Sequence, residues 1–288
     1  MEDFYNNSSS QDQSSDYSHS DFKNNSHQYY DLPLTKNVTY IIVGIGLPLT
    51  LMAIYALYST VRSDHVAPIY VINLLMSDLL QLCCMIVHVT QPQDGKISQI
   101  FYYIYYFGLF TSVYFMVCIS LERYLVIVHP LWYRFRRTIK TSVVFCVLVW
   151  VITLVCGVLY YVFKGYVVTK IIFPVFLLPP FPLLIFFLVG TLKALSAAMS
   201  VPSDEKRRIV GILVLVLLIY TLLFLPNIIF YLVIYDKTLD ILSLIFVRFS
   251  PLADLFLYVF MRKGAIDKLL ASVCCCRMDR NEISSPSV

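Results

Sequence analysis

The sequence predicts an all-α membrane protein, a bundle of seven transmembrane helices followed by a short amphipathic eighth helix. Of its 288 residues, 59% are hydrophobic and only 14% are charged, whereas about a quarter of the residues of soluble domains are charged. A helix needs about 20 apolar residues to cross the hydrocarbon core of a bilayer. Seven such stretches follow one another, at residues 38–60, 67–89, 98–128, 141–163, 169–192, 208–234 and 239–260.

These stretches divide the chain into three regions. Residues 1–37 are rich in Ser, Asn, Asp and Gln and predict a disordered tail. Residues 38–261 form the membrane domain, and residues 262–288 the eighth helix and a short tail. No basic segment followed by an apolar stretch occurs in the first region, so the first membrane helix is expected to act as an uncleaved targeting signal.

Lysine and arginine set the expected orientation. If the N-terminus lies outside, the cytoplasmic segments hold fourteen of these residues and the outer segments six, as the positive-inside rule requires. We therefore predict a multi-pass protein of the plasma membrane with an extracellular N-terminus and a cytoplasmic C-terminus. The basic pI reflects this topology and indicates no nucleic-acid partner. The tail also carries glycosylation sequons, at Asn6, Asn7, Asn24 and Asn37.

The cysteines fall within the spans or in the C-terminal tail, and none lies in a predicted extracellular loop. A disulfide on the oxidising side of the membrane is therefore not expected. The five cysteines within the spans are interpreted as small packing residues. No metal-ligand cluster, nucleophile constellation or phosphate-binding loop is present in the sequence, so an enzyme is not expected.

Ionisable residues inside the spans are candidate functional residues, because burying them in a membrane is costly. Asp78 lies midway along the second span and Asp254 in the inner half of the seventh. With the hydroxyl groups of Ser112 and Ser250 they could form an oxygen-rich site for a sodium ion. The alternative is a hydrogen-bonded water network in which one acid is protonated.

Two further charged groups stand out. Glu122-Arg123-Tyr124 closes the third span at its predicted cytoplasmic end, where the alternative is an ordinary charged helix end. Arg248 lies about ten residues, or about 15 Å, below the outer end of the seventh span. At that depth it is expected to face the central cavity and to pair with an anionic ligand or with an internal partner. His88 is the only histidine expected near the outer membrane face.

Together these residues resemble the rhodopsin-like family of G-protein-coupled receptors, over residues 39–276. The closest similarity, in residues 118–137, is to the branch of nucleotide, lysolipid and proton-sensing receptors. The motifs that carry the resemblance are Asp78, Glu122-Arg123-Tyr124, Trp150, Phe224 and Pro226, Asp254 to Tyr258, and residues 262–272 followed by Cys274, Cys275 and Cys276.

The resemblance implies a role for each motif. Asp78 would be the buried acid of the sodium site, and Arg123 would leave Glu122 on activation to receive a heterotrimeric G protein, supported by Tyr258. The inner end of the sixth span would swing outward about a hinge at Phe224 and Pro226. The three tail cysteines would be palmitoylated and hold the eighth helix to the inner leaflet.

The chain also departs from the family pattern. Ser98 replaces the usual cysteine of the third span, and the second extracellular loop, residues 164–170, contains no partner cysteine. Thr50 replaces an asparagine in the first span. Leu255 replaces the proline of the seventh span, so the inner end of that helix is expected to keep its full hydrogen-bond ladder.

The predicted function is therefore a receptor that passes an extracellular signal to G proteins, with no cofactor apart from a bound sodium ion. The ligand is expected to be anionic, a lipid or a nucleotide, because Arg248 offers a partner for a carboxylate or phosphate. A strong proton sensor is not expected, because Thr153 stands where proton-sensing relatives have a third acid. The alternatives are a seven-helix receptor that binds but couples weakly or not at all, and a transporter or channel, which would show internal repeats.

Overall fold

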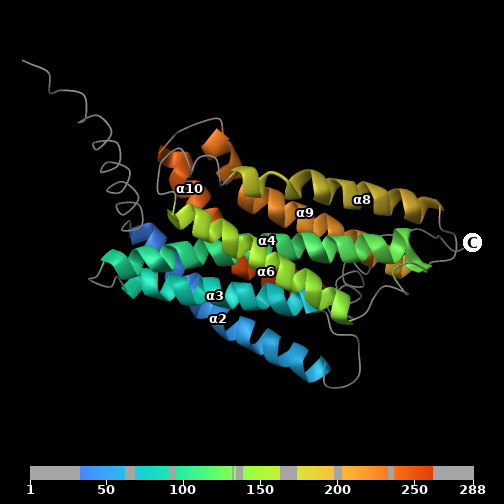
Figure 1. Cartoon of the computed structure of the whole chain (residues 1–288), viewed down its shortest axis with the longest axis horizontal. Helices are drawn as coiled ribbons and strands as arrows, with labels where there is room; N and C mark the ends of the chain where they lie inside the picture. Colours follow the sequence, from blue (N-terminus) through green and yellow to red (C-terminus); the bar gives the residue numbers. More distant parts are fainter. Residues whose placement is uncertain are drawn as a thin grey trace, which may run out of the picture.

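The computed structural model describes residues 33–61, 69–90, 95–131, 133, 139–162, 174–197, 203–232 and 237–261. Every element in this part of the chain is helical (Figure 1). The helices are α2 (Pro33–Val61), α3 (Ile69–Thr90), α4 (Gly95–Val128), α6 (Ile139–Val162), α8 (Pro180–Ala197), α9 (Ser203–Leu232), α10 (Lys237–Arg248) and α11 (Ser250–Met261).

Among the described residues, seven segments are long and apolar enough to cross a membrane, which confirms the predicted seven-helix bundle. In order they are Pro33–Tyr58, Ile69–Thr90, Lys96–Val128, Lys140–Leu159, Pro174–Ser196, Arg207–Phe230 and Ile241–Met261. Their mean hydropathy is 1.7 or more, so each is more stable in lipid than in water. The protein is an integral multi-pass membrane protein.

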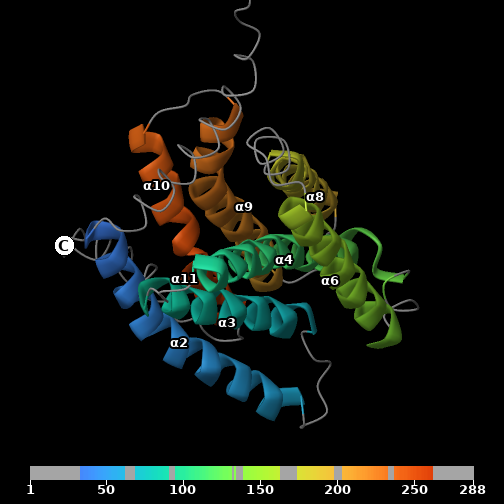
Figure 2. The same cartoon turned by 60° about the vertical axis from the view of Figure 1, so that its left-hand side comes forward.

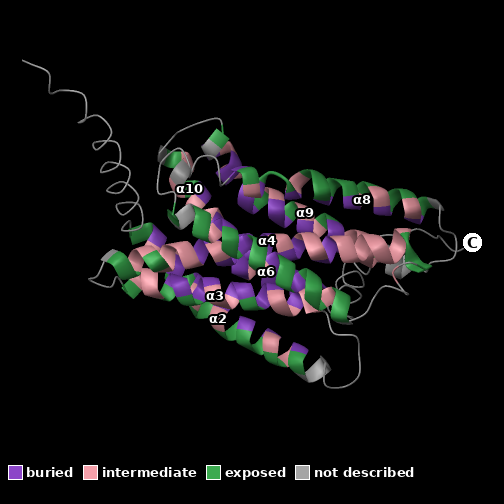
Figure 3. Ribbon diagram, viewed as in Figure 1, coloured by how far each residue is buried: buried purple, intermediate pink, exposed green. Residues whose placement is uncertain are grey.

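The third span is the axis of the bundle. Helix α4 packs against α3, α6, α8 and α9, and the second view shows it crossing between α3 and the pair α8 and α9 (Figure 2). In its most apolar segment 72% of the residues are buried, whereas in that of α6 only 22% are buried. Exposed residues accordingly cover much of the outer helices, where side chains such as Phe145 and Leu148 are apolar (Figure 3). A face of this kind suits contact with lipid rather than with water.

The first span begins earlier than the sequence indicated, at Pro33 rather than at residue 38. Proline is well accepted in the first turn of a helix, because the N–H that it lacks would have no partner there. Asn37 consequently lies within α2, with an exposed side chain, while Thr39 of the same sequon is buried. The sequons at Asn6, Asn7 and Asn24 lie outside the described residues, as do the predicted eighth helix and Cys274, Cys275 and Cys276.

The seventh span is made of two helices, α10 and α11, separated at Phe249. Pro251 cannot donate a backbone hydrogen bond, and its ring disfavours a regular helix before it. The backbone here instead forms 3₁₀-type hydrogen bonds to the residue three positions earlier. Phe249 N donates to Phe246 O at 3.0 Å, and Leu252 N donates to Phe249 O at 3.1 Å. Beyond the break, α11 runs as one helix through Leu255 to Met261. The interruption thus lies nearer the pocket than the position where the family has its proline.

Candidate functional site

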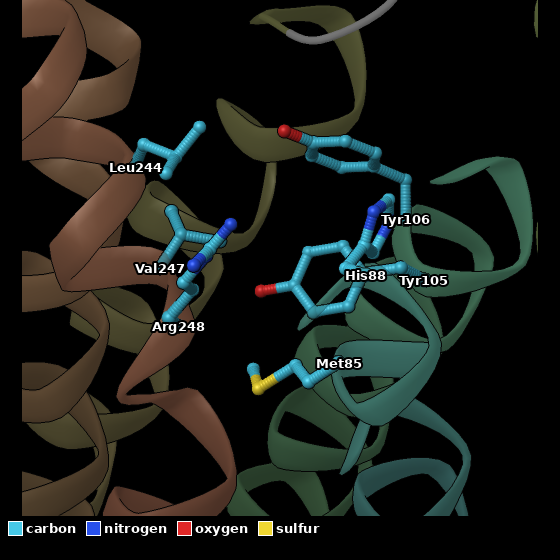
Figure 4. Close-up of a pocket in the computed structure, with 7 residues that line it drawn as sticks. All are labelled: Met85, His88, Tyr105, Tyr106, Leu244, Val247 and Arg248. Atoms are coloured by element: carbon cyan, nitrogen blue, oxygen red, sulfur yellow. The ribbon is translucent and has the colours of Figure 1, made fainter. Parts of the chain in front are cut away.

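A small pocket lies at the end of the bundle where α2 begins, between α3, α4 and α10 (Figure 4). Side chains from α3 and α4 face side chains from α10 across it. The space between them is about 10 Å³, about enough for one water molecule. A larger ligand would have to displace side chains in order to enter. The lining residues are Met85, His88, Tyr105, Tyr106, Leu244, Val247 and Arg248.

Arg248 supplies a positive charge to this pocket. It is 6% exposed, and its guanidinium donates to the backbone carbonyl of Thr35 at 3.2 Å and to the hydroxyl of Thr39. Both acceptors belong to the first turns of α2, and neither carries a charge. The internal partner that the sequence left open is therefore present, and Arg248 joins the first and seventh spans at the end of the bundle that holds the pocket.

Aromatic side chains of α4 form the opposite wall. His88 lies edge-on to the ring of Tyr102, with 6.3 Å between the ring centroids. The ring centroids of Tyr102 and Tyr106 are 4.7 Å apart, and those of Tyr106 and Tyr105 are 5.3 Å apart. The phenol ring of Tyr105 points across the space toward Arg248 (Figure 4). The pocket therefore combines a cationic wall with a wall of aromatic rings and polar tips.

The four residues predicted for an ion site all lie in the bundle interior. Asp78, Ser112, Ser250 and Asp254 have no exposed surface. The carboxyl groups of Asp78 and Asp254 interact across the contact between α3 and α11. Within the described part of the chain, Asp78 Oδ2, Ser250 Oγ and both oxygens of Asp254 have no hydrogen-bond partner. Gln81 Nε2 donates to Asp78 Oδ1 at 3.4 Å, which is a long bond.

This arrangement has a clear chemical requirement. Buried carboxylate oxygens only accept hydrogen bonds, so two facing carboxylates need a proton or a cation between them. Ser112 uses its proton on the carbonyl of Leu109 at 2.9 Å, which leaves its oxygen lone pairs available. The donor set consists of hard oxygen atoms, which fits a monovalent or hard cation. It fits a shared proton with bound water equally well.

At the opposite end of the bundle, the predicted switch has an arrangement that the sequence did not indicate. Glu122 Oε1 accepts a hydrogen bond from the hydroxyl of Tyr133 at 2.7 Å. In the described residues no ion pair joins Glu122 to Arg123, and the buried Nε of Arg123 has no hydrogen-bond partner. Tyr133 therefore holds the acid that was expected to restrain Arg123. Tyr258, the other residue of the predicted switch, is buried in α11.

Tyr124 points away from this group and into the face of α8. Its ring lies 5.7 Å from that of Phe186 and 5.4 Å from that of Phe187. A Cβ atom at Gly190 would lie 2.6 Å from the Tyr124 ring, so only glycine allows this approach of α8 to the third span. The switch arginine is thus flanked by a tyrosine that anchors its helix to the fifth span.

Phe224 and Pro226, the predicted hinge, lie in the C-terminal half of α9. Phe224 is fully buried and stacks on Tyr220, with centroids 5.1 Å apart and planes at 30°. Pro226 lies inside the helix, so the carbonyl of Leu222 lacks its usual backbone donor four residues on. A bend at this point requires no further loss of backbone hydrogen bonding.

Two tyrosines that sequence reasoning missed stabilise a break in the fifth span. Residues 174–177 are helical, and α8 starts again at Pro180. Pro180 cannot donate to the carbonyl of Phe176, which instead accepts from Tyr114 Oη of α4 at 3.4 Å. Phe181 N donates to Leu178 O at 3.2 Å rather than to the carbonyl of Leu177. The carbonyl of Leu177 instead accepts a hydrogen bond from Tyr220 Oη of α9. The pair Pro179-Pro180 was the signal that could have indicated these freed carbonyls.

Trp150 also has a defined environment. Its indole Nε1 donates to Asn73 Oδ1 at 3.0 Å, which joins α6 to α3. Its ring lies 5.5 Å from that of Phe107 and 6.0 Å from that of Phe115, both on α4. One turn away on the same helix, Thr153 is within 2.9 Å of the hydroxyl of Thr111 and is fully buried. The position of the missing third acid is therefore filled by a satisfied hydroxyl pair.

The described structure defines a class of protein, a seven-span integral membrane protein with a largely apolar and aromatic pocket beside Arg248 at one end and with Arg123 at the other. Residues 49–171 match the family described as "7 transmembrane receptor (rhodopsin family)". The match covers less than half of the chain, and together with the seven spans it bears out the predicted resemblance to the rhodopsin-like receptors.

Individual relatives agree with this assignment. The chain is 31% identical to G-protein coupled receptor 68 of Mus musculus over 121 residues, which is 39% of the chain and 33% of that protein. It is 31% identical to Mas-related G-protein coupled receptor member A6 of Mus musculus over 148 residues, 48% of each chain. It is 30% identical to the type-1 angiotensin II receptor of Oryctolagus cuniculus over 119 residues, 39% of the chain and 33% of that receptor.

These relatives are receptors, and the first of them falls in the branch predicted from the sequence. The matched segments span less than half the length of each of these relatives. The likeness therefore supports the family, and the ligand and partners of this chain are matters for proposal.

Proposed function

We propose that the chain is a receptor that passes an extracellular signal to heterotrimeric G proteins at the plasma membrane, with its N-terminus outside. The observation that carries the proposal is the state of Arg123. Its Nε is buried without a hydrogen-bond partner at the inner end of the third span, and the adjacent acid is bonded to Tyr133. A buried guanidinium nitrogen without a partner is costly, so a partner that offers carbonyl or carboxylate groups would be bound favourably.

The proposed mechanism is a shift between two arrangements of the bundle. Ligand entry at the pocket would favour an arrangement in which the inner half of α9 moves outward about Phe224 and Pro226. The cleft so opened would admit a helix of the G protein next to Arg123, and Tyr258 would support it. Because Pro226 already lacks its backbone bond, this motion costs less than bending a regular helix.

The experiment compares Arg123→Ala with the unaltered chain for G-protein activation at matched surface expression. We expect activation to fall to background in Arg123→Ala while surface level stays constant. Glu122→Gln removes the adjacent negative charge and is expected to raise basal activation, whereas Tyr133→Phe frees Glu122 to pair with Arg123 and is expected to lower it. Lys193→Ala, at an exposed position near the same end of the bundle, is the control. Unchanged activation in Arg123→Ala would favour the alternative of a receptor that binds without coupling.

For the ligand we propose a molecule with a carboxylate or phosphate, such as an anionic lipid or a nucleotide. Arg248 donates to two neutral acceptors of α2, and an anion that replaced either of them would gain a charge-assisted bond. The apolar and aromatic lining would accept the remainder of the ligand. An agonist found in lipid and nucleotide panels should lose at least about tenfold in potency in Arg248→Gln, the scale of a lost charged hydrogen bond. Undiminished potency would exclude this role.

A sodium ion bound between Asp78 and Asp254 is the second part of the proposal. Supporting it are the fully buried, unpartnered carboxylate oxygens and the hydroxyls of Ser112 and Ser250. Sodium should raise the thermal stability of the purified protein relative to equal concentrations of a bulky organic cation, and Asp78→Asn should abolish the difference. A difference that persists in Asp78→Asn would exclude the site. A protein insensitive to sodium would favour the shared proton and bound water.

We also propose two covalent modifications and one limit on the response. The tail would be glycosylated at Asn6, Asn7 and Asn24, with Asn37 disfavoured by its place in α2. The cysteines at 274, 275 and 276 would be palmitoylated. A strong response to extracellular acid is not expected, because Thr153 is engaged with Thr111 and His88 is the single histidine in the pocket.

A further inference from the structure

Arg208 joins the inner ends of the sixth and seventh spans. It lies in the second turn of α9, and its Nη2 donates to the backbone carbonyl of Met261 at 2.5 Å. Met261 is the last residue of α11, so this carbonyl lies at the end of the helix where the backbone dipole is negative. A guanidinium is the side chain best suited to that position, because it keeps its charge and offers several donors.

The neighbouring contacts place the two helices close together at the same level. Gly211, one turn further along α9, would place a Cβ atom 3.7 Å from the Phe260 ring. Arg207, the adjacent arginine, is exposed, whereas Arg208 is partly buried. Two basic residues next to each other in the chain therefore have different environments, and only Arg208 is aimed at α11.

The position of Arg208 makes this bond sensitive to motion of the sixth span. It lies 18 residues from Pro226, or about 27 Å along the helix at 1.5 Å per residue. A change of about 10° in the bend at Pro226 moves Arg208 by about 5 Å over that length, which breaks a hydrogen bond of 2.5 Å. The outward arrangement and this bond are therefore mutually exclusive.

We infer that Arg208 is a positioning residue that keeps the sixth span closed against the end of the seventh, and that its release is part of activation. This inference rests on the proposed function, because it assigns the restraint on the same coupling site. The restraint joins the sixth and seventh spans through a main-chain carbonyl. It does not require an acid on the sixth span, and it leaves Arg123 out of the closed contact.

The test separates the geometry of the restraint from signalling. Spin labels at Lys140→Cys on α6 and Arg207→Cys on α9, both exposed positions, report the distance between the inner ends of these helices. Cys83 and the three tail cysteines are first replaced by serine, and labelled protein is measured in lipid nanodiscs by pulsed electron resonance. We expect Arg208→Gln to enrich the longer distances about tenfold, the shift that loss of a charged hydrogen bond produces. Lys193→Gln, which removes one charge from an exposed position, should leave the distribution unchanged.

Basal G-protein activation of Arg208→Gln and Arg207→Gln is measured in parallel, without labels, at matched surface expression. A rise with Arg208→Gln and not with Arg207→Gln supports the inference. An unchanged distance distribution in Arg208→Gln overturns it, whatever the signalling result. Longer distances without any activation in any variant would retain the restraint and overturn the proposed coupling to G proteins.

Discussion

Substituting Tyr220 by phenylalanine removes one hydroxyl from the break in the fifth span and leaves the packing in place. The ring keeps its stacking on Phe224 at 5.1 Å. The carbonyl of Leu177 loses the donor that replaces its backbone partner, and Leu177 and Tyr220 are each only 1% exposed. Water therefore cannot readily satisfy that carbonyl in the variant.

The magnitude follows from the cost of a buried unsatisfied group. Leaving one buried acceptor without a donor costs about 1–3 kcal/mol, which corresponds to a factor of about 5–150 in an equilibrium or rate constant. Tyr114→Phe should cost less, because its bond to the carbonyl of Phe176 is 3.4 Å long. We expect Tyr220→Phe to destabilise the protein most and Tyr114→Phe to destabilise it less. The same substitution at an exposed tyrosine should have no effect on stability.

The assay is the half-life of the detergent-solubilised protein at a fixed elevated temperature, since unfolding of a membrane protein is rarely reversible. Tyr58→Phe, at a position 67% exposed, is the control for a lost hydroxyl. A half-life of Tyr220→Phe equal to that of the control would refute the reasoning that tyrosine replaces the missing backbone donor.

Three glycine substitutions test the other close contacts with the same assay. Gly190→Ala should shorten the half-life, because its Cβ would lie 2.6 Å from the Tyr124 ring, and an unchanged value would show that the ring has room to move. Gly211→Ala should lengthen it, since the added methyl meets Phe260 at an ordinary 3.7 Å and alanine favours the helix by about 0.5–1 kcal/mol. An added Cβ at Gly44 would meet no atom within 4 Å, so Gly44→Ala should lengthen the half-life only through the higher helix propensity of alanine. A larger increase at Gly44 than at Gly211 would contradict a stabilising contact between the added methyl group and Phe260.

The seven spans were predictable because the signal is local. About 20 consecutive apolar residues must be helical in a bilayer, and the predicted second span, residues 67–89, differs from Ile69–Thr90 by only one or two residues at each end. Pro33 and Phe249 mark two features that hydropathy does not predict. A proline can begin a helix that composition assigns to the tail, and a break within an apolar run leaves its mean hydropathy unchanged.

Parts of the candidate site were predictable for a different reason. Asp78 and Asp254 were identified because a charge in a membrane segment is conspicuous wherever it lies. Their proximity in space came only from the fold. The partners of Arg248 lie 213 and 209 residues away along the chain, and a backbone carbonyl leaves no trace in the sequence. The donor to Glu122 was also missed, because Tyr133 resembles any other interfacial tyrosine.

The environment of Trp150 makes the protein its own optical probe. The chain has only two tryptophans, Trp132 and Trp150, so Trp132→Phe would leave a single indole emitter. That indole is hydrogen-bonded to Asn73 and lies within 6.0 Å of two phenylalanine rings of α4. Its emission wavelength and lifetime would report the junction of the second, third and fourth spans without an attached dye. Rearrangement of α4 could then be followed in native lipid as a shift in the emission wavelength of Trp150.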